Sequence, residues 1–242
     1  MALALIHLLT LGWLDSHPLV LEQLEFVPAR LTAAWQEGNP LLLLSSGMSL
    51  ITQMFLHYSG NLSHLLGNML GLFALGPAVE ARLGGRRFLA LFLLSGIAGA
   101  LTMTMISPAD SAPLIGASGA IFGVATAYMV LWWRTGRVFS LVMLGPVPLP
   151  LLLSAPAAVG LKVGMELWAV MTMKNDFSGP FVAVAHWDHL GGIVTGIVVG
   201  LLYHYRILGK RLPLPEHTLI EVPDARDLFR YFRRKLTPAK GL

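Results

Sequence analysis

The chain contains no cysteine and few charged residues. Cysteine is absent from all 242 positions, which excludes a disulfide framework and a thiolate metal site. Charged residues make up only 12% of the chain, against about 25% in a soluble domain. Hydrophobic residues make up 55%, and the mean hydropathy is +0.67. This composition indicates a protein that crosses a membrane several times. The net charge of +4 bears on its topology and gives no indication of nucleic-acid binding.

Apolar segments predict an all-α fold, in which residues 1–206 form a six-helix transmembrane bundle and residues 207–242 form a basic tail. A chain of this length has room for about six spans of roughly 20 residues. The first segment would cover only about 20 Å of a hydrocarbon core about 30 Å thick. Residues 15–60 are mixed in character and predict a long connection at the membrane interface. The expected spans are residues 2–14, 62–79, 88–106, 115–133, 149–171 and 182–205.

Basic residues alternate between the connections, which sets the orientation. They cluster after the second, fourth and sixth spans, and the other connections carry few. By the positive-inside rule, we expect both termini in the cytoplasm. Residues 224–236 of the tail predict a basic amphipathic helix, either on the inner membrane surface or docked on cytoplasmic loops. The clustered residues are Arg82, Arg86, Arg87, Arg134, Arg137, Arg206, Lys210 and Arg211.

Ser118 and His189 are the candidate catalytic pair. Residues 116–119 read Gly-Ala-Ser-Gly at the non-cytoplasmic start of one span, and residues 189–192 read His-Leu-Gly-Gly at the start of another. Glycines allow helices and a substrate backbone to approach closely, although such patterns also serve simple helix packing. A histidine inside a membrane is costly and often functional. A serine beside a histidine is the minimum equipment for nucleophilic catalysis.

His64, Asn68 and Gly116 are the candidates for binding an oxyanion. His64 and Asn68 are four residues apart, so they share one helix face, at the same expected depth as Ser118 and His189. Their side chains are suitable hydrogen-bond donors to a developing negative charge. The alternative for both is hydrogen bonding between helices. Gly116 clears space in front of the serine.

Other catalytic chemistries fit the sequence poorly. No His-Glu-x-x-His run is present and no two acidic residues share a span centre, so neither a metalloprotease nor an aspartyl protease is supported. Asp188 points about 100° away from His189 on a helix, which favours a serine–histidine pair without a third carboxylate. Lys162 and Glu166 form a four-apart pair that can neutralise itself. We expect no cofactor and no metal site.

These motifs together resemble the rhomboid family of intramembrane serine proteases. The resemblance covers roughly residues 45–205 in the right order. It includes residues 57–64 (His-Tyr-Ser-Gly-Asn-Leu-Ser-His), Asn68-Met69, residues 76–80 (a Gly-x-x-x-Glu pattern) and the motifs at 116–119 and 189–192. The combination is specific, although each motif alone is not. One departure is Met48-Ser49, where the family often carries Trp-Arg, and it bears on how the first long loop is anchored.

The resemblance implies a six-helix bundle around a cavity that opens to the non-cytoplasmic side. Ser118 would be the nucleophile, His189 the general base, and His64, Asn68 and the Ser118 N–H the oxyanion hole. Substrates would be single-span membrane proteins in the lipid bilayer, and the location a bacterial inner membrane. A different class of function stays open, that of a non-catalytic relative that binds membrane proteins and assists their movement or turnover. Such relatives lose the serine or the histidine, and both are present here. A proton-coupled transporter is disfavoured, because Glu166 is the only acidic residue well inside a span.

Overall fold

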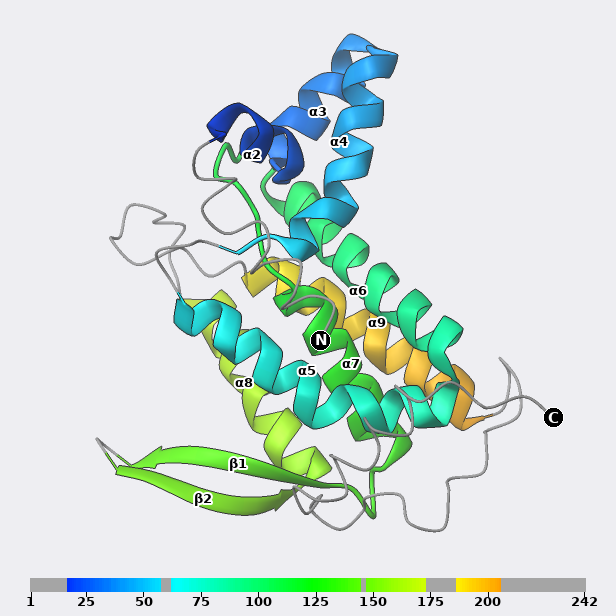
Figure 1. The fold of residues 1–242 in the computed structure, drawn as a ribbon, viewed down its shortest axis with the longest axis vertical. Coiled ribbons are helices and arrows are strands. Elements are labelled where there is room, and N and C mark those ends of the chain that lie inside the picture. Colours follow the sequence, from blue (N-terminus) through cyan, green and yellow to red (C-terminus); the bar gives the residue numbers. More distant parts are fainter. Residues whose placement is uncertain (1–16, 58–61, 145–146, 173–185, 206–242) are drawn as a thin grey trace, which may run out of the picture.

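The computed structural model describes residues 17–57, 62–144, 147–172 and 186–205, and these are mostly helical (Figure 1). The predicted first span at 2–14 and the predicted tail helix at 224–236 lie outside the described residues.

The segment before the bundle, which was expected at the membrane interface, folds into short helices that begin at prolines. These are α2 (Pro18–Leu24), α3 (Pro28–Glu37) and α4 (Pro40–Thr52), followed by the 3-10 turn η1 (Gln53–Phe55). Proline suits the first helical position because its missing N–H would have no intrahelical partner there. Gly38 ends α3 in the left-handed conformation, and the Asn39 side chain caps α4 by accepting from two backbone N–H groups. The helices α3 and α4 project from one end of the bundle (Figure 1).

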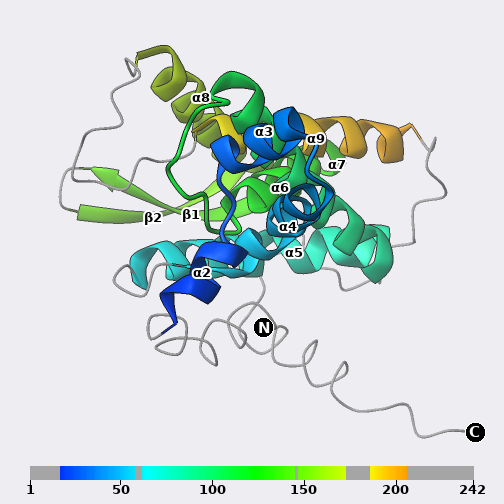
Figure 2. The same ribbon diagram turned by 90° about the horizontal axis from the view of Figure 1, so that it is seen from above.

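Five longer helices form the bundle in the described part of the chain. They are α5 (Leu62–Leu83), α6 (Gly85–Ile106), α7 (Ser118–Leu131), α8 (Ala155–Thr172) and α9 (His186–His204). The helix α7 lies at the centre, beside α5, α6 and α9, whereas α8 lies at the edge in both views (Figures 1 and 2).

A β-hairpin corrects the expected all-α fold. Strands β1 (Arg137–Leu144) and β2 (Val147–Ser154) pair antiparallel, with Arg137 opposite Ser154. The helix α8 therefore begins at Ala155, whereas the expected span began at residue 149. The apolar run of Leu, Pro and Val in β2 suits a strand as well as a helix. Periodicity alone cannot separate a strand from a helix over so few residues. The hairpin lies at the end of the bundle away from α3 and α4 (Figure 1).

Glycines bring α7 and α9 into backbone contact. A Cβ atom at Gly192 would overlap the carbonyl oxygen of Gly119, and one at Gly196 would overlap that of Gly123. Beside these contacts, the Thr126 hydroxyl donates to the Ile193 carbonyl at 3.1 Å. Small residues allow this approach between helices, and the interhelical hydrogen bond adds to it.

Many large apolar side chains point outward, whereas several polar ones are buried. The buried polar residues include Gln53, Ser95 and Thr126, each at most 1% exposed. Among the described residues, Gly85–Ile106 is the one helix with both the length and the apolar composition to cross a bilayer, so the expected count of six spans is not established. Outward-facing apolar side chains on the bundle include Leu66, Leu70, Leu94, Met105, Met165 and Trp168.

Candidate active site

Ser118 is the first residue of α7, and the segment before it is held by the N-terminal helices. Phe26 and Leu114 exchange two backbone hydrogen bonds, of 3.2 and 2.7 Å, and the Gly116 N–H donates to the Gln53 carbonyl at 2.9 Å. Phe26 and Gln53 therefore tie the first long loop, in which Met48-Ser49 stands in place of Trp-Arg, to the segment before Ser118. The first N–H groups of a helix have no intrahelical partner, so the start of α7 offers donors to an anion.

His189 lies within hydrogen-bond distance of the serine. Its Nε2 atom is 2.8 Å from the Ser118 hydroxyl oxygen, and the histidine is only 6% exposed. The ring of Phe122 packs on the imidazole with centroids 4.5 Å apart. Phe122 was not singled out from the sequence, although it lies one helical turn after Ser118 and so shares its face. A buried imidazole held in this way can take the hydroxyl proton.

His64, Asn68 and Gly116, the predicted oxyanion-binding residues, lie next to one another. Gly116 has φ +122°, and a Cβ there would lie 2.7 Å from Cε1 of His64 and 3.6 Å from Nδ2 of Asn68. Glycine is therefore needed both for the backbone conformation and for the space. The Asn68 amide also contacts Nε2 of His57 at 2.8 Å. His57 was quoted only as part of a motif, and the structure places it behind the Asn68 amide.

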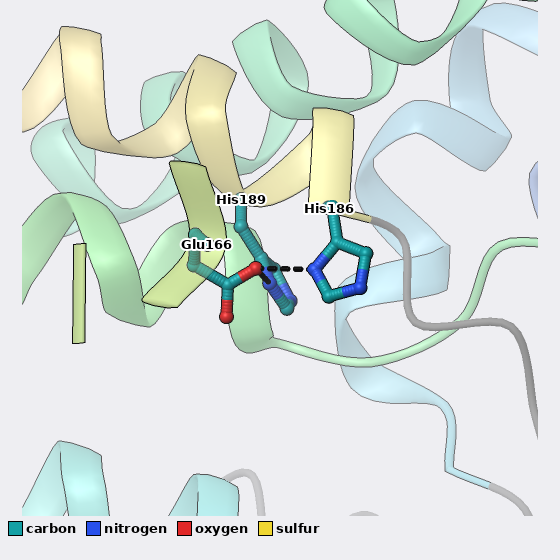
Figure 3. A group of neighbouring side chains, drawn as sticks. All are labelled: Glu166, His186 and His189. Carbon is teal, nitrogen blue, oxygen red and sulfur yellow. Dashed lines mark hydrogen bonds and ion pairs between the residues drawn. The ribbon is translucent and has the colours of Figure 1, made fainter. Parts of the chain in front are cut away.

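A carboxylate missed by the sequence interpretation lies on the far side of the His189 ring. Glu166 of α8 places Oε2 2.9 Å from Nδ1 of His189 and 2.5 Å from Nδ1 of His186 (Figure 3). The contact with His186 is a hydrogen bond, and the contact with His189 is an ion pair when that ring is protonated. Ser118 and Glu166 thus contact opposite nitrogens of one imidazole. The sequence signal was the helical pair Lys162 and Glu166, but Lys162 is exposed and the Glu166 carboxylate is directed to the histidines.

Asp188 is fully buried and points away from the site. Its carboxylate accepts a hydrogen bond from the Gly119 N–H, and Cβ atoms at Gly99 or Gly119 would overlap it. This agrees with the expected offset of about 100° from His189. Asp188 therefore links α9 to α6 and α7 and does not orient the imidazole.

Comparison with known proteins identifies the family. The model of the Rhomboid domain matches residues 45–206. The chain belongs to the rhomboid family. It is 36% identical over 166 residues to the rhomboid protease GluP of Bacillus subtilis, covering 69% of this chain and 28% of that protein. As a member of this family, the chain is an integral membrane protein.

Two relatives of lower identity come from eukaryotes. RHOMBOID-like protein 4 of Arabidopsis thaliana is 26% identical over 68% of this chain and 37% of its own length. Rhomboid protein 1, mitochondrial, of Saccharomyces cerevisiae is 32% identical over 43% of this chain and 32% of its own length. The matched region thus spans well under half the length of these curated relatives.

Proposed function

We propose that this rhomboid is an intramembrane serine endopeptidase that hydrolyses peptide bonds in or near the transmembrane segments of other membrane proteins. The observation that carries this function is the 2.8 Å contact between the Ser118 hydroxyl and Nε2 of His189, formed between two helices locked by glycine packing. The name of the Bacillus subtilis relative, a rhomboid protease, agrees with it.

The chemistry follows from the two ring nitrogens of His189. The Ser118 oxygen attacks the scissile carbonyl carbon while its proton passes to Nε2, and the leaving amine then takes that proton. Water next attacks the acyl-enzyme carbonyl while Nε2 again accepts a proton, and that proton returns to the Ser118 oxygen as the acyl–oxygen bond breaks and the new carboxyl end leaves. Nε2 accepts only when the single proton of the neutral ring sits on Nδ1. The Glu166 carboxylate beside Nδ1 favours this tautomer and stabilises the imidazolium.

The negative charge that develops on the carbonyl oxygen is met by neutral donors. His64 and Asn68 border the space that Gly116 leaves open, and we propose that the Ser118 N–H is the third donor. Such donors act strongly where water is scarce, because they are already oriented when charge develops. Hydrolysis nonetheless requires water at the site, which is consistent with polar side chains at this depth.

The location is proposed from the sequence pattern. The alternation of basic loops favours a multi-pass protein with both termini in the cytoplasm, and the similarity to a Bacillus subtilis protein favours a bacterial cell membrane. The site would then open to the non-cytoplasmic side, where a single-span substrate could unwind into it.

Cleavage in liposomes tests this function. Wild-type protein is expected to cut a fluorescent single-span reporter, and the Ser118→Ala variant is expected to bind the reporter without cutting it. The non-catalytic alternative predicts that both proteins bind the reporter and that neither cleaves it. Cleavage retained in Ser118→Ala, with purity checked by mass spectrometry, would falsify the role of Ser118.

A further inference from the structure

Three metal-ligating side chains converge beside the catalytic pair. One ligand atom from each of Glu166, His186 and His189 lies within 4.8 Å of the other two. The two histidines approach the same carboxylate oxygen through their Nδ1 atoms, from the first turn of α9, while Glu166 reaches them from α8 (Figure 3).

A single carboxylate oxygen serves both histidines of this cluster. Oε2 of Glu166 lies 2.5 Å from Nδ1 of His186 and 2.9 Å from Nδ1 of His189, so the two ring nitrogens share one acceptor oxygen. A single cation between the three atoms would serve both nitrogens and the carboxylate together.

The donor set matches a borderline-soft divalent ion. Two imidazole nitrogens and one carboxylate oxygen are the protein ligands of open zinc sites, which leave a fourth position for water. Mg²⁺ and Ca²⁺ prefer oxygen ligands and suit this set poorly. The side chains of Glu166 and His186 are each 14% exposed, so an ion has access from outside.

We infer that Glu166, His186 and His189 form a binding site for a divalent transition-metal ion such as Zn²⁺, and that the bound ion inhibits the protease. The inhibition rests on the proposed function. A metal on Nδ1 of His189 displaces the proton from that atom, and the single proton of the neutral ring then sits on Nε2. Nε2 loses the lone pair that takes the Ser118 proton. Carbonyl attack therefore stops, although Ser118 and His189 stay in place.

Direct binding separates the site from catalysis. Tag-free Ser118→Ala protein, stripped with chelator, is titrated with Zn²⁺ by calorimetry in detergent. We expect one saturating site, and we expect the added His186→Gln change to weaken it by more than about 100-fold, since even changes outside the ligand shell cost 10–100-fold. His204→Gln, at the other end of α9, is the matched control and should keep the site. Absent binding, or binding undiminished by His186→Gln, overturns the metal site.

Activity then tests inhibition. We expect Zn²⁺ to stop reporter cleavage by the wild type, EDTA to restore it, and Mg²⁺ to have no effect. EDTA alone should leave activity intact, because no catalytic step uses the ion. The ratio of rates with and without Zn²⁺, taken within each variant, should rise toward one in His186→Gln and stay low in His204→Gln. Binding without inhibition, or inhibition that persists in His186→Gln, overturns the inhibitory role. If the wild type cleaves nothing, the proposed function fails, whereas binding by Ser118→Ala still decides whether the site exists.

Discussion

Two helices meet His189 from opposite sides, and they are attached to α9 in different ways. On the Ser118 side, Gly119 and Gly123 of α7 lie in backbone contact with Gly192 and Gly196 of α9. On the Glu166 side, a Cβ added to Gly164 of α8 would meet no described atom within 4 Å. The buried residues of α8 all lie at its start, Ala155, Ala158 and Val159.

The difference separates two levels of constraint on one imidazole. Backbone packing fixes the distance from Nε2 of His189 to the Ser118 hydroxyl, because α7 and α9 cannot move toward each other without overlap of their backbones. The contact with Nδ1 depends on side chains at the loosely packed end of α8. His189 and Ser118 are therefore held rigidly together, whereas the group that contacts Nδ1 of His189 can change.

The largest effect is expected from breaking the tight side. Gly192→Leu places a side chain where the Gly119 carbonyl lies, which forces α7 and α9 apart. A misplacement of about 1 Å can cost about 100-fold in rate, and a leucine requires more than that. Cleavage should fall to the level of Ser118→Ala, with a lower melting temperature in detergent. A Gly192→Leu protein with wild-type kcat would contradict the packing account.

The next largest loss of activity is expected from a change on a third helix, α5. Asn68→Ala removes one oxyanion donor, which typically costs about 10²–10³ in kcat. The residual rate distinguishes this variant from loss of the nucleophile. Reporter titrations should show the loss in kcat rather than in KM. Either no effect or a loss as complete as that of Ser118→Ala would count against a donor role.

The loose side should give a smaller effect. Glu166→Gln keeps the shape of the side chain and removes the charge beside Nδ1 of His189. We expect kcat to fall about tenfold, corresponding to about 1.4 kcal/mol of lost stabilisation of the imidazolium. Unchanged melting in detergent would show that the loss is not structural. A rate equal to wild type would mean that the carboxylate does not act on the base.

The smallest effect on activity is expected from a change on the exposed face of α8. Gly164→Leu adds the same side chain as Gly192→Leu, but to the open face of α8. Since leucine has the higher helix propensity, we expect activity within about twofold of wild type and no loss of stability. Damage similar to that of Gly192→Leu would show that α8 is as tightly packed as α9.

The sequence predicted much of this site because its signals are local. Ser118, His189, His64 and Asn68 were placed at one depth from helix ends and four-residue spacing, and the structure brings them together. Glu166 was missed because its partners lie twenty or more residues later in the chain, and spacing within a helix favoured Lys162 instead. The hairpin of β1 and β2 was missed because a short apolar run fits a helix or a strand equally well.

The most direct measurement is the rate at which a fluorophosphonate modifies the protein, followed by intact mass spectrometry and peptide mapping. A hydroxyl activated by Nε2 of His189 predicts a single adduct on Ser118 in the wild type and none in Ser118→Ala. In His189→Ala, labelling should slow by about 10²-fold or more, because the hydroxyl loses its base. Labelling of a folded His189→Ala protein at the wild-type rate, or an adduct on another residue, would contradict the pairing of Ser118 with His189.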